Sequence, residues 1–401
     1  MLSTLNKEVS GMTKRVFCIS LCCLIICSFA MGAEKEGFKI GMTVSMTGPF
    51  SQEVGPFKDL IKAWESRVNQ KGGINIGGKS YNIEVIVYDD RSDQNTARTS
   101  YERLIRTEKV NMLLGPYSSP LTFAASIAAE ENKIPFLAIC GNSQKIYERD
   151  FKWLLGILDL APSYTKHYWN LIKHENFIKT VAFVVEDSMH PKSVYAGAKE
   201  LASNYGFNII HEDIVSSDTQ DFSGLILKLK NQKADLIFVS ANVHFASAFM
   251  RQAKEKGLEA KEFHCIHHSG VFKKAVGDFA ENVVGQMYWV KGMKTTDSEE
   301  FSLLLKQAKV DPYDYPWAAA YFAAFQTVEQ ALKQSPGISN QNILDSLKSQ
   351  EYDTICGKNS FEAKGHGKIN PMPAQIQEGT YQILWPKSVA TSQHKYRSPK
   401  G

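Results

Sequence analysis

The sequence predicts an α/β protein of two lobes, in which helices cover both faces of mainly parallel sheets. From Phe38 to about residue 290, short and almost continuously apolar segments alternate with amphipathic stretches of a dozen or more residues. This alternation is typical of parallel strands buried on both faces and connected by helices. The expected strands are too many for one sheet, and a helix-rich block comes late in the chain. We therefore expect two α/β lobes that share a discontinuous chain.

The elements of this fold are expected in a regular order. Glycines at Gly72-Gly73, Gly206 and Gly257 end three of the helices, since glycine is favoured just beyond a last turn. After residue 290 the pattern predicts three helices and then short strands between 361 and 385, and the polar tail, residues 391–401, is expected to fray. The expected strands are 39–44, 83–88, 110–114, 134–139, 180–185, 208–214, 236–239 and 262–266; the helices are 57–70, 96–107, 121–131, 162–173, 193–205, 222–231, 245–256, 297–310, 317–333 and 340–349.

The composition is that of a globular protein. The chain has 401 residues, of which 43% are hydrophobic and 11% aromatic, and this argues against disorder. The formal net charge is +4, and residues 1–33 carry three basic groups and one acidic group, so the remainder is nearly balanced. This balance argues against a nucleic-acid partner and against a polybasic membrane surface.

Residues 1–33 are predicted to be a secretory signal peptide. Lys14 and Arg15 precede an apolar run from Val16 to Ala30, and small residues follow at the expected cleavage point. Met12 is an alternative start, and an uncleaved anchor is the competing interpretation of the same run. Export places the mature protein in the periplasm and removes four of the seven cysteines. Of the remaining Cys140, Cys265 and Cys356, at most one pair can form a disulfide.

Ligand contacts are expected in the loops that follow the strands. In open parallel sheets, ligands bind beyond the carboxyl ends of the strands, next to helix N-termini. Ser119 before Pro120 is expected to cap a helix, with its hydroxyl available to a carboxylate. The loops concerned are 115–120, 140–143, 186–191, 240–244 and 267–270.

Histidines gather at the strand ends of the second half, but a metal site is not expected. His264 and His267 lie three residues apart on an expected strand, so their side chains point to opposite faces, and no Cys or carboxylate has metal-ligand spacing. The motifs of common catalytic sites are missing from the sequence. We expect neither a metal, nor a cofactor, nor an enzymatic activity.

Several short motifs, in order, carry a resemblance to a known family. They are Lys39-Ile40-Gly41-Met42, Thr47-Gly48-Pro49, Lys71-Gly72-Gly73-Ile74, 88–93, 115–119, Asp221-Phe222-Ser223, Arg251-Gln252-Ala253 and 361–365. Together they resemble the leucine/isoleucine/valine-type periplasmic binding proteins, which are the substrate-binding components of ABC importers. The resemblance covers residues 38–386.

The resemblance implies two doubly wound lobes joined by a three-strand hinge, with the ligand enclosed between them. Lobe one would comprise 38–158 plus 290–368, and lobe two 159–289 plus 369–390. The ligand would close the lobes by contacting both, and a membrane permease would recognise the closed form. The implied partners are a small-molecule ligand and an ABC-transporter permease, and we expect a monomer.

The resemblance also assigns candidate ligand contacts. In lobe one it implies that hydroxyl and N–H groups hold a ligand carboxylate, and in lobe two it places His267 where relatives carry an acidic partner for the ligand ammonium. Without that acid, an amine-free and possibly aromatic organic acid is favoured, although Glu186 or Asp187 leaves an amino acid open. The candidate residues are Tyr117, Ser118, Ser119, Gly141, Asn142, Ser143, Asp187, His190, Asn242, His267 and Trp317.

Three other functions remain as alternatives. A periplasmic ligand-sensing module of the same fold would bind without transport. A secreted enzyme would need a catalytic constellation, and a metal-binding protein would use the histidines.

Overall fold

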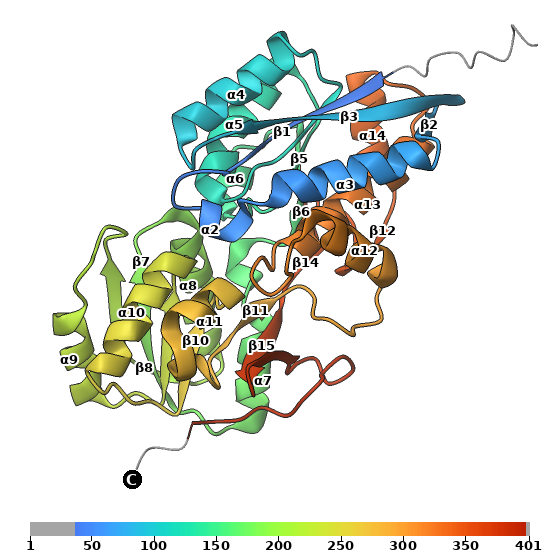
Figure 1. Cartoon of the computed structure of the whole chain (residues 1–401). Coiled ribbons are helices and arrows are strands. Elements are labelled where there is room, and N and C mark those ends of the chain that lie inside the picture. The colour runs from blue at the N-terminus through green and yellow to red at the C-terminus, as the bar shows by residue number, and fades with distance from the viewer. Residues whose placement is uncertain (1–36, 398–401) are drawn as a thin grey trace, which may run out of the picture.

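The computed structural model describes residues 37–397, and the predicted signal peptide lies outside them. Within this range the chain forms two α/β lobes, one above the other in Figure 1, each built on a seven-stranded sheet. A small hairpin of β12 (Tyr352–Thr354) and β13 (Gly357–Asn359) is separate from both sheets. Of the described helices, none is long and apolar enough to cross a membrane.

The sheet of the first lobe has the strand order β14-β6-β5-β4-β1-β3-β2. All neighbouring strands are parallel except β2, which pairs antiparallel with β3 at one edge. The central strands are buried along their length, as expected for strands covered on both faces. The strands are β1 (Gly37–Val44), β2 (Ile74–Ile76), β3 (Lys79–Asp89), β4 (Met112–Leu114), β5 (Phe136–Ala138), β6 (Leu154–Leu158) and β14 (His366–Ile369).

Helices from both ends of the sequence cover this sheet, which explains the late helical block. Trp64 of α3 stacks on Phe325 of α13, with ring centroids 4.3 Å apart, and its indole N–H donates to Glu329 at 2.8 Å. The helices of this lobe are α2 (Ser51–Val54), α3 (Phe57–Gln70), α4 (Gln94–Arg106), α5 (Ser119–Asn132), α6 (Gln144–Tyr147), α12 (Ser298–Ala308), α13 (Ala318–Gln334) and α14 (Asn340–Lys348).

The sheet of the second lobe has the order β16-β15-β11-β10-β9-β7-β8, with β15 and β16 antiparallel to their neighbours. One helix expected over 162–173 is broken into η1 (Ala161–Ser163) and α7 (Lys166–Glu175). The other elements are β7 (Thr180–Glu186), α8 (Met189–Asn204), β8 (Asn208–Val215), α9 (Ser223–Gln232), β9 (Leu236–Ser240), α10 (Val243–Glu255), β10 (Glu262–Cys265), α11 (Gly270–Val276), η2 (Gly277–Ala280), β11 (Val284–Met287), β15 (Met372–Gln377) and β16 (Thr380–Ile383).

The chain passes between the two lobes three times within the described residues. These crossings follow β6, β11 and β14, so each lobe is assembled from separate segments. The strand-end loops of the two sheets face one another across the crossings (Figure 1).

The expectation of a frayed tail is wrong for residues 391–397. The ring of His394 is buried, and its two nitrogens lie 2.7 Å from carboxylate oxygens of Glu175 and Glu262. The backbone N–H of Arg397 donates to the carbonyl of Lys261 at 2.9 Å. The polar composition of the tail suggests fraying. In the structure, however, the carboxylates of Glu175 and Glu262 on the second lobe bind His394 of the tail. Cys140, Cys265 and Cys356 are free thiols.

Candidate functional site

The strand-end loops of both lobes meet around two small adjoining cavities. Each has a volume of about 10 Å³, close to the space that one water molecule needs, so the closed site is nearly filled by side chains. Tyr164, His267 and Trp317 border both cavities. The first cavity is also lined by Tyr117, Ser118, Ser119, Cys140, Asn142, Leu158, His190 and Asn242, and the second by Glu53, Val243, Ser269, Gln286, Tyr288 and Pro316.

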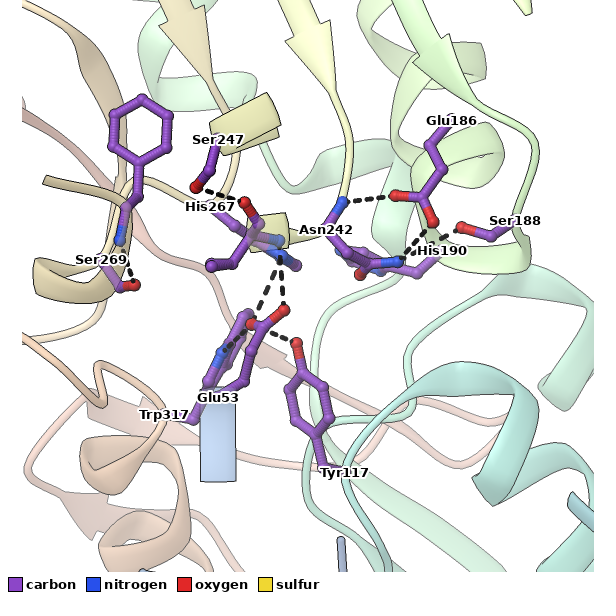
Figure 2. A network of polar contacts seen from close by, with 12 residues as sticks. Glu53, Tyr117, Glu186, Ser188, His190, Asn242, Ser247, His267, Ser269 and Trp317 are labelled. Carbon is purple, nitrogen blue, oxygen red and sulfur yellow. Dashed lines mark hydrogen bonds and ion pairs between the residues drawn. The ribbon is translucent and has the colours of Figure 1, made fainter. Parts of the chain in front are cut away.

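Glu53 is the residue that most directly joins the two lobes at this site (Figure 2). It lies on the short helix α2 of the first lobe and is only 4% exposed. One carboxylate oxygen accepts from the hydroxyl of Tyr117 at 2.6 Å and from the indole N–H of Trp317 at 3.0 Å. The other oxygen accepts from the backbone N–H of Val243, the first residue of α10 in the second lobe, at 3.3 Å. The side chain therefore spans the cleft.

The surroundings of Glu53 disfavour its charge. Burial raises the pKa of the carboxyl, although the hydrogen bonds from Tyr117, Trp317 and Val243 work in the opposite direction. Of the residues that the structure describes, no lysine or arginine lines either cavity. The carboxylate is thus stabilised by hydrogen bonds without a fixed counter-charge.

His190 and His267 stack at the second-lobe side of the site, with ring centroids 5.4 Å apart and planes 16° apart. Burial lowers the pKa of His267 to about 3 and that of His190 well below its ordinary value, so both rings are neutral near pH 7. Nδ1 of His190 lies 3.0 Å from the amide oxygen of Asn142, so this nitrogen carries the ring proton and Nε2 is an acceptor. The site does not present the charged imidazolium that an organic anion would favour most.

A second buried carboxylate, Glu186, lies at the end of β7. It accepts from the backbone N–H of Asn242 at 2.7 Å and from the amide of the same residue at 3.0 Å. Burial raises the pKa of Glu186, while the hydrogen bonds from Asn242 lower it. Asp187, the next residue, is half-exposed and pairs with Lys192. Glu186 lines neither cavity itself, but it holds Asn242, which lines the first cavity.

The first-lobe loops form a tight polar turn around Ser119. The residue that caps α5 is Ser118, not Ser119 as the sequence suggests: Ser118 has a φ of 79°, and its hydroxyl accepts from Leu121 N–H. The Ser119 hydroxyl instead accepts from the backbone N–H groups of Asn142 and Ser143, at 3.3 and 3.1 Å. The two loops are thereby held against each other next to the first cavity.

Most of the residues expected from the sequence border a cavity. Gly141, Ser143 and Asp187 do not: Gly141 packs against Thr122 of α5, Ser143 is the N-cap residue before α6, and Asp187 is half-exposed and pairs with Lys192. The predicted residues that do line the cavities are Tyr117, Ser118, Ser119, Asn142, His190, Asn242, His267 and Trp317.

The most important residue missed from the sequence is Glu53. Position 267 carries a histidine in place of the relatives' acid, as the sequence shows, but an acid from the other lobe lies beside it: Oε2 of Glu53 is 3.6 Å from Nδ1 of His267. Ligands bind beyond the carboxyl ends of parallel strands, and this holds for β1 as well. Glu53 lies nine residues beyond Val44, the last residue of β1, so the loop after β1 was the signal that could have found it. Gln286 and Tyr288 were missed because they lie on and just after β11, outside any expected element. No group of three or more metal-binding side chains occurs among residues 37–397.

The fold and the site together define a class: a two-lobed α/β binding protein with its site between the lobes. A family model described as periplasmic binding protein matches residues 37–379, and the chain belongs to this family. Its relatives include the leucine-specific-binding protein of Salmonella typhimurium, 20% identical over 354 residues, which cover 85% of this chain and 91% of the relative. Another relative is the Leu/Ile/Val-binding protein of Escherichia coli, 21% identical over 372 residues, which cover 89% of this chain and 94% of the relative. The family and these relatives are binding proteins, not enzymes.

Solved structures confirm the fold class. The isoleucine complex of the branched-chain amino acid transporter substrate binding protein LivJ from Streptococcus pneumoniae has a TM-score of 0.76 at 19% identity, covering 88% of this chain and 100% of LivJ. A solute binding protein of an ABC transporter from Rhodopseudomonas palustris, solved with 3,4-dihydroxy benzoic acid, has a TM-score of 0.73 at 22% identity, covering 90% of this chain and 99% of the other.

Proposed function

We propose that this protein captures a small carboxylate-bearing solute between its lobes in the periplasm and delivers it to an ABC importer. The observation that carries the proposal is the convergence of strand-end residues from both lobes on one buried site. Asn142 of the first lobe bonds His190 of the second, and Glu53 bonds Val243 across the same cleft. A solute that touches both walls stabilises the closed form over the open one, and a permease recognises that form.

The carboxylate of the solute is assigned to the first-lobe loops. The N-terminus of α5 and the hydroxyls of Ser118 and Ser119 border the first cavity. Free N–H groups and hydroxyls at a helix N-terminus favour an anion. The named neighbours support this class of solute, since one was solved with isoleucine and another with a dihydroxybenzoic acid, and both ligands carry a carboxylate.

A solute must enter through an opened cleft. The cavities hold about one water each, and their walls are buried aromatic and histidine side chains from both lobes. Binding therefore requires rotation of the lobes about the three crossings, followed by closure. Export through the N-terminal leader would bring the protein to the compartment in which such capture is useful.

The test is a thermal-shift and calorimetry screen of the purified protein against amino acids and against amine-free aliphatic and aromatic acids. A solute at 100 times its Kd adds about 2.7 kcal/mol of stability. The matched neutral amides of each hit serve as controls, and equal binding of acid and amide would contradict the carboxylate assignment.

Delivery is tested separately, by uptake of the labelled solute in cells with and without the protein. Loss of uptake in the deletion strain supports the importer. Unchanged uptake, with the protein still binding the solute, would favour a ligand-sensing module of the same fold.

A further inference from the structure

Asn142 connects three parts of the molecule: the first-lobe wall of the site, one of the crossings between the lobes, and the second lobe. It is buried and follows β5, in the loop that borders the first cavity. Its backbone N–H donates to the hydroxyl oxygen of Ser119 at 3.3 Å, which fixes this loop to the N-terminal turn of α5. Its backbone carbonyl and both polar atoms of its side chain also have partners in the protein.

The first crossing, residues 159–161, is held by Asn142 through two hydrogen bonds. The side-chain nitrogen Nδ2 donates to the carbonyl oxygen of Asp159 at 3.0 Å, and the backbone carbonyl of Asn142 accepts from the N–H of Ala161 at 2.8 Å. These residues connect β6 of the first lobe with η1 of the second. Because Nδ2 is bound to Asp159, the amide oxygen Oδ1 points away from the crossing.

The carbonyl of Asp159 is itself fixed in place by the third crossing. The backbone N–H of Asp159 donates to the carbonyl of Ile369, the last residue of β14, at 3.0 Å. Its carboxylate accepts from the N–H of Leu160 at 2.7 Å and from the side-chain amide of Asn370, where the third crossing begins, at 2.9 Å. Two crossings are therefore bound together at the point that orients the amide of Asn142.

The amide oxygen of Asn142 contacts the second lobe at His190, the second residue of α8. It lies 3.0 Å from Nδ1 of that ring, the nitrogen that carries the proton. Helix α8 is packed tightly on the second-lobe end of the first crossing: a Cβ atom at Gly197 would lie 2.1 Å from the carbonyl oxygen of Pro162 in η1. Because interiors packed this closely do not deform freely, we expect α8 and η1 to move as one body.

We infer that Asn142 is a positioning residue for closure of the cleft: Asp159 orients its amide so that the oxygen receives His190 when the second lobe rotates inward. This inference rests on the proposed function and concerns how the cleft closes, not what it holds. The sequence places Asn142 among the ligand contacts because it lies in a strand-end loop. The hydrogen bond between Glu53 and Val243 also spans the cleft, but it involves no residue of a crossing.

The first test is small-angle scattering of the solute-free protein and of the variants Asn142→Ala and His190→Phe, alone and combined. Asn142→Ala removes the amide and keeps the backbone groups, and His190→Phe keeps an aromatic ring without its N–H. Each single variant should have a larger radius of gyration than the natural protein. The double variant should be no larger than the more open single variant, because both changes remove the same hydrogen bond.

The matched control is Asn132→Ala. Asn132 is the last residue of α5 in the same lobe, and its amide donates to the carbonyl of Ala128 within that helix. This variant loses an asparagine hydrogen bond that spans neither the cleft nor a crossing, so its scattering curve should match that of the natural protein.

The second test measures binding, with isoleucine and 3,4-dihydroxybenzoate as the probes, the ligands of the two solved neighbours. A smaller population of closed protein weakens all solutes alike. Asn142→Ala should therefore raise the Kd of each probe that binds by the same factor, about 3- to 10-fold, which corresponds to one hydrogen bond. A direct contact between Asn142 and the solute would instead change the two Kd values by different factors.

The outcomes separate this inference from the proposed function. An unchanged scattering curve for Asn142→Ala overturns the inference, and so does a double variant that expands by the sum of the two single variants. Unequal changes in the two Kd values also overturn it. If Asn142→Ala does not fold, His190→Phe removes the same bond from the other lobe, and its scattering curve decides. Scattering uses no solute, so a failed solute screen would contradict the proposed function without affecting this decision.

Discussion

The carboxylate of Glu53 in the first lobe receives the backbone N–H of Val243, at the first turn of α10 in the second lobe, over 3.3 Å. Anions are stabilised at helix N-termini, and α10 has no side-chain cap of its own from Asn242. Glu53 thus caps a helix of the opposite lobe. This contact links a residue that lines the second cavity with closure of the cleft.

Removing this contact should favour the open form. We expect Glu53→Ala to increase the radius of gyration of the solute-free protein in small-angle scattering, because the hydrogen bond across the cleft is lost. Glu84→Ala is the control, since Glu84 is exposed. An unchanged scattering curve for Glu53→Ala would show that the other contacts between the lobes are sufficient for closure.

His394 should hold the C-terminal tail on the second lobe. Burial disfavours the charged ring, but Glu262 and Glu175 outweigh it and raise the pKa of His394 to about 10. His394→Ala leaves Glu262, which is 1% exposed, without its counter-charge, so we expect a loss of about 3–5 kcal/mol in urea unfolding. Because the folded pKa lies above the unfolded value, this stabilisation is complete below about pH 6.5 and is lost as the pH rises through 10. A variant as stable as the natural protein at pH 6 would contradict this role.

Buried neutral histidines should make the protein sensitive to mild acid. Burial lowers the pKa of His268 to about 3, so below pH 6.5 the unfolded chain takes up a proton that the folded protein does not. The contribution to the free energy of unfolding is complete above pH 6.5. As the pH falls below 6.5, each such histidine lowers the free energy of unfolding by about 1.4 kcal/mol per pH unit. Glu53, Asp90 and Glu186 have raised pKa values and change the stability in the opposite direction as the pH falls. The contribution of His268 is therefore obtained from the difference between the natural protein and a variant that lacks this histidine. Between pH 6 and 4.5, His268→Gln should lose stability less steeply than the natural protein. Parallel pH profiles would contradict the assignment.

Gly141 should be required for the first-lobe loop although it lines neither cavity. A Cβ atom there would lie 2.2 Å from the hydroxyl oxygen of Thr122. We expect Gly141→Ala to cost about 1–3 kcal/mol and to weaken solute binding, because the loop that carries Asn142 must move. Thr122→Ala in the same chain should restore little, because the Cβ atom of residue 122 would still lie 2.4 Å from the new Cβ atom. Gly224→Ala, in α9 with open space around it, is the control and should not destabilise.

The fold class and most of the ligand-facing loops follow from local features of the sequence. Strands such as Thr180–Glu186 are apolar throughout because both of their faces are covered, and this local property is visible in the sequence. The polar turns that follow the strands are equally local, which is why Tyr117, Asn142 and His267 were expected and do border the site.

Which charged groups meet depends on the packing of segments that lie far apart in the chain. Glu53 and Trp317 are 264 residues apart, and no periodicity relates them, yet they share a hydrogen bond in the cleft. His394 was expected to fray because its neighbours in sequence are polar, but its partners Glu175 and Glu262 come from α7 and β10. Electrostatic pairing depends on distance in space and on burial, and neither is encoded in the spacing of residues along the chain.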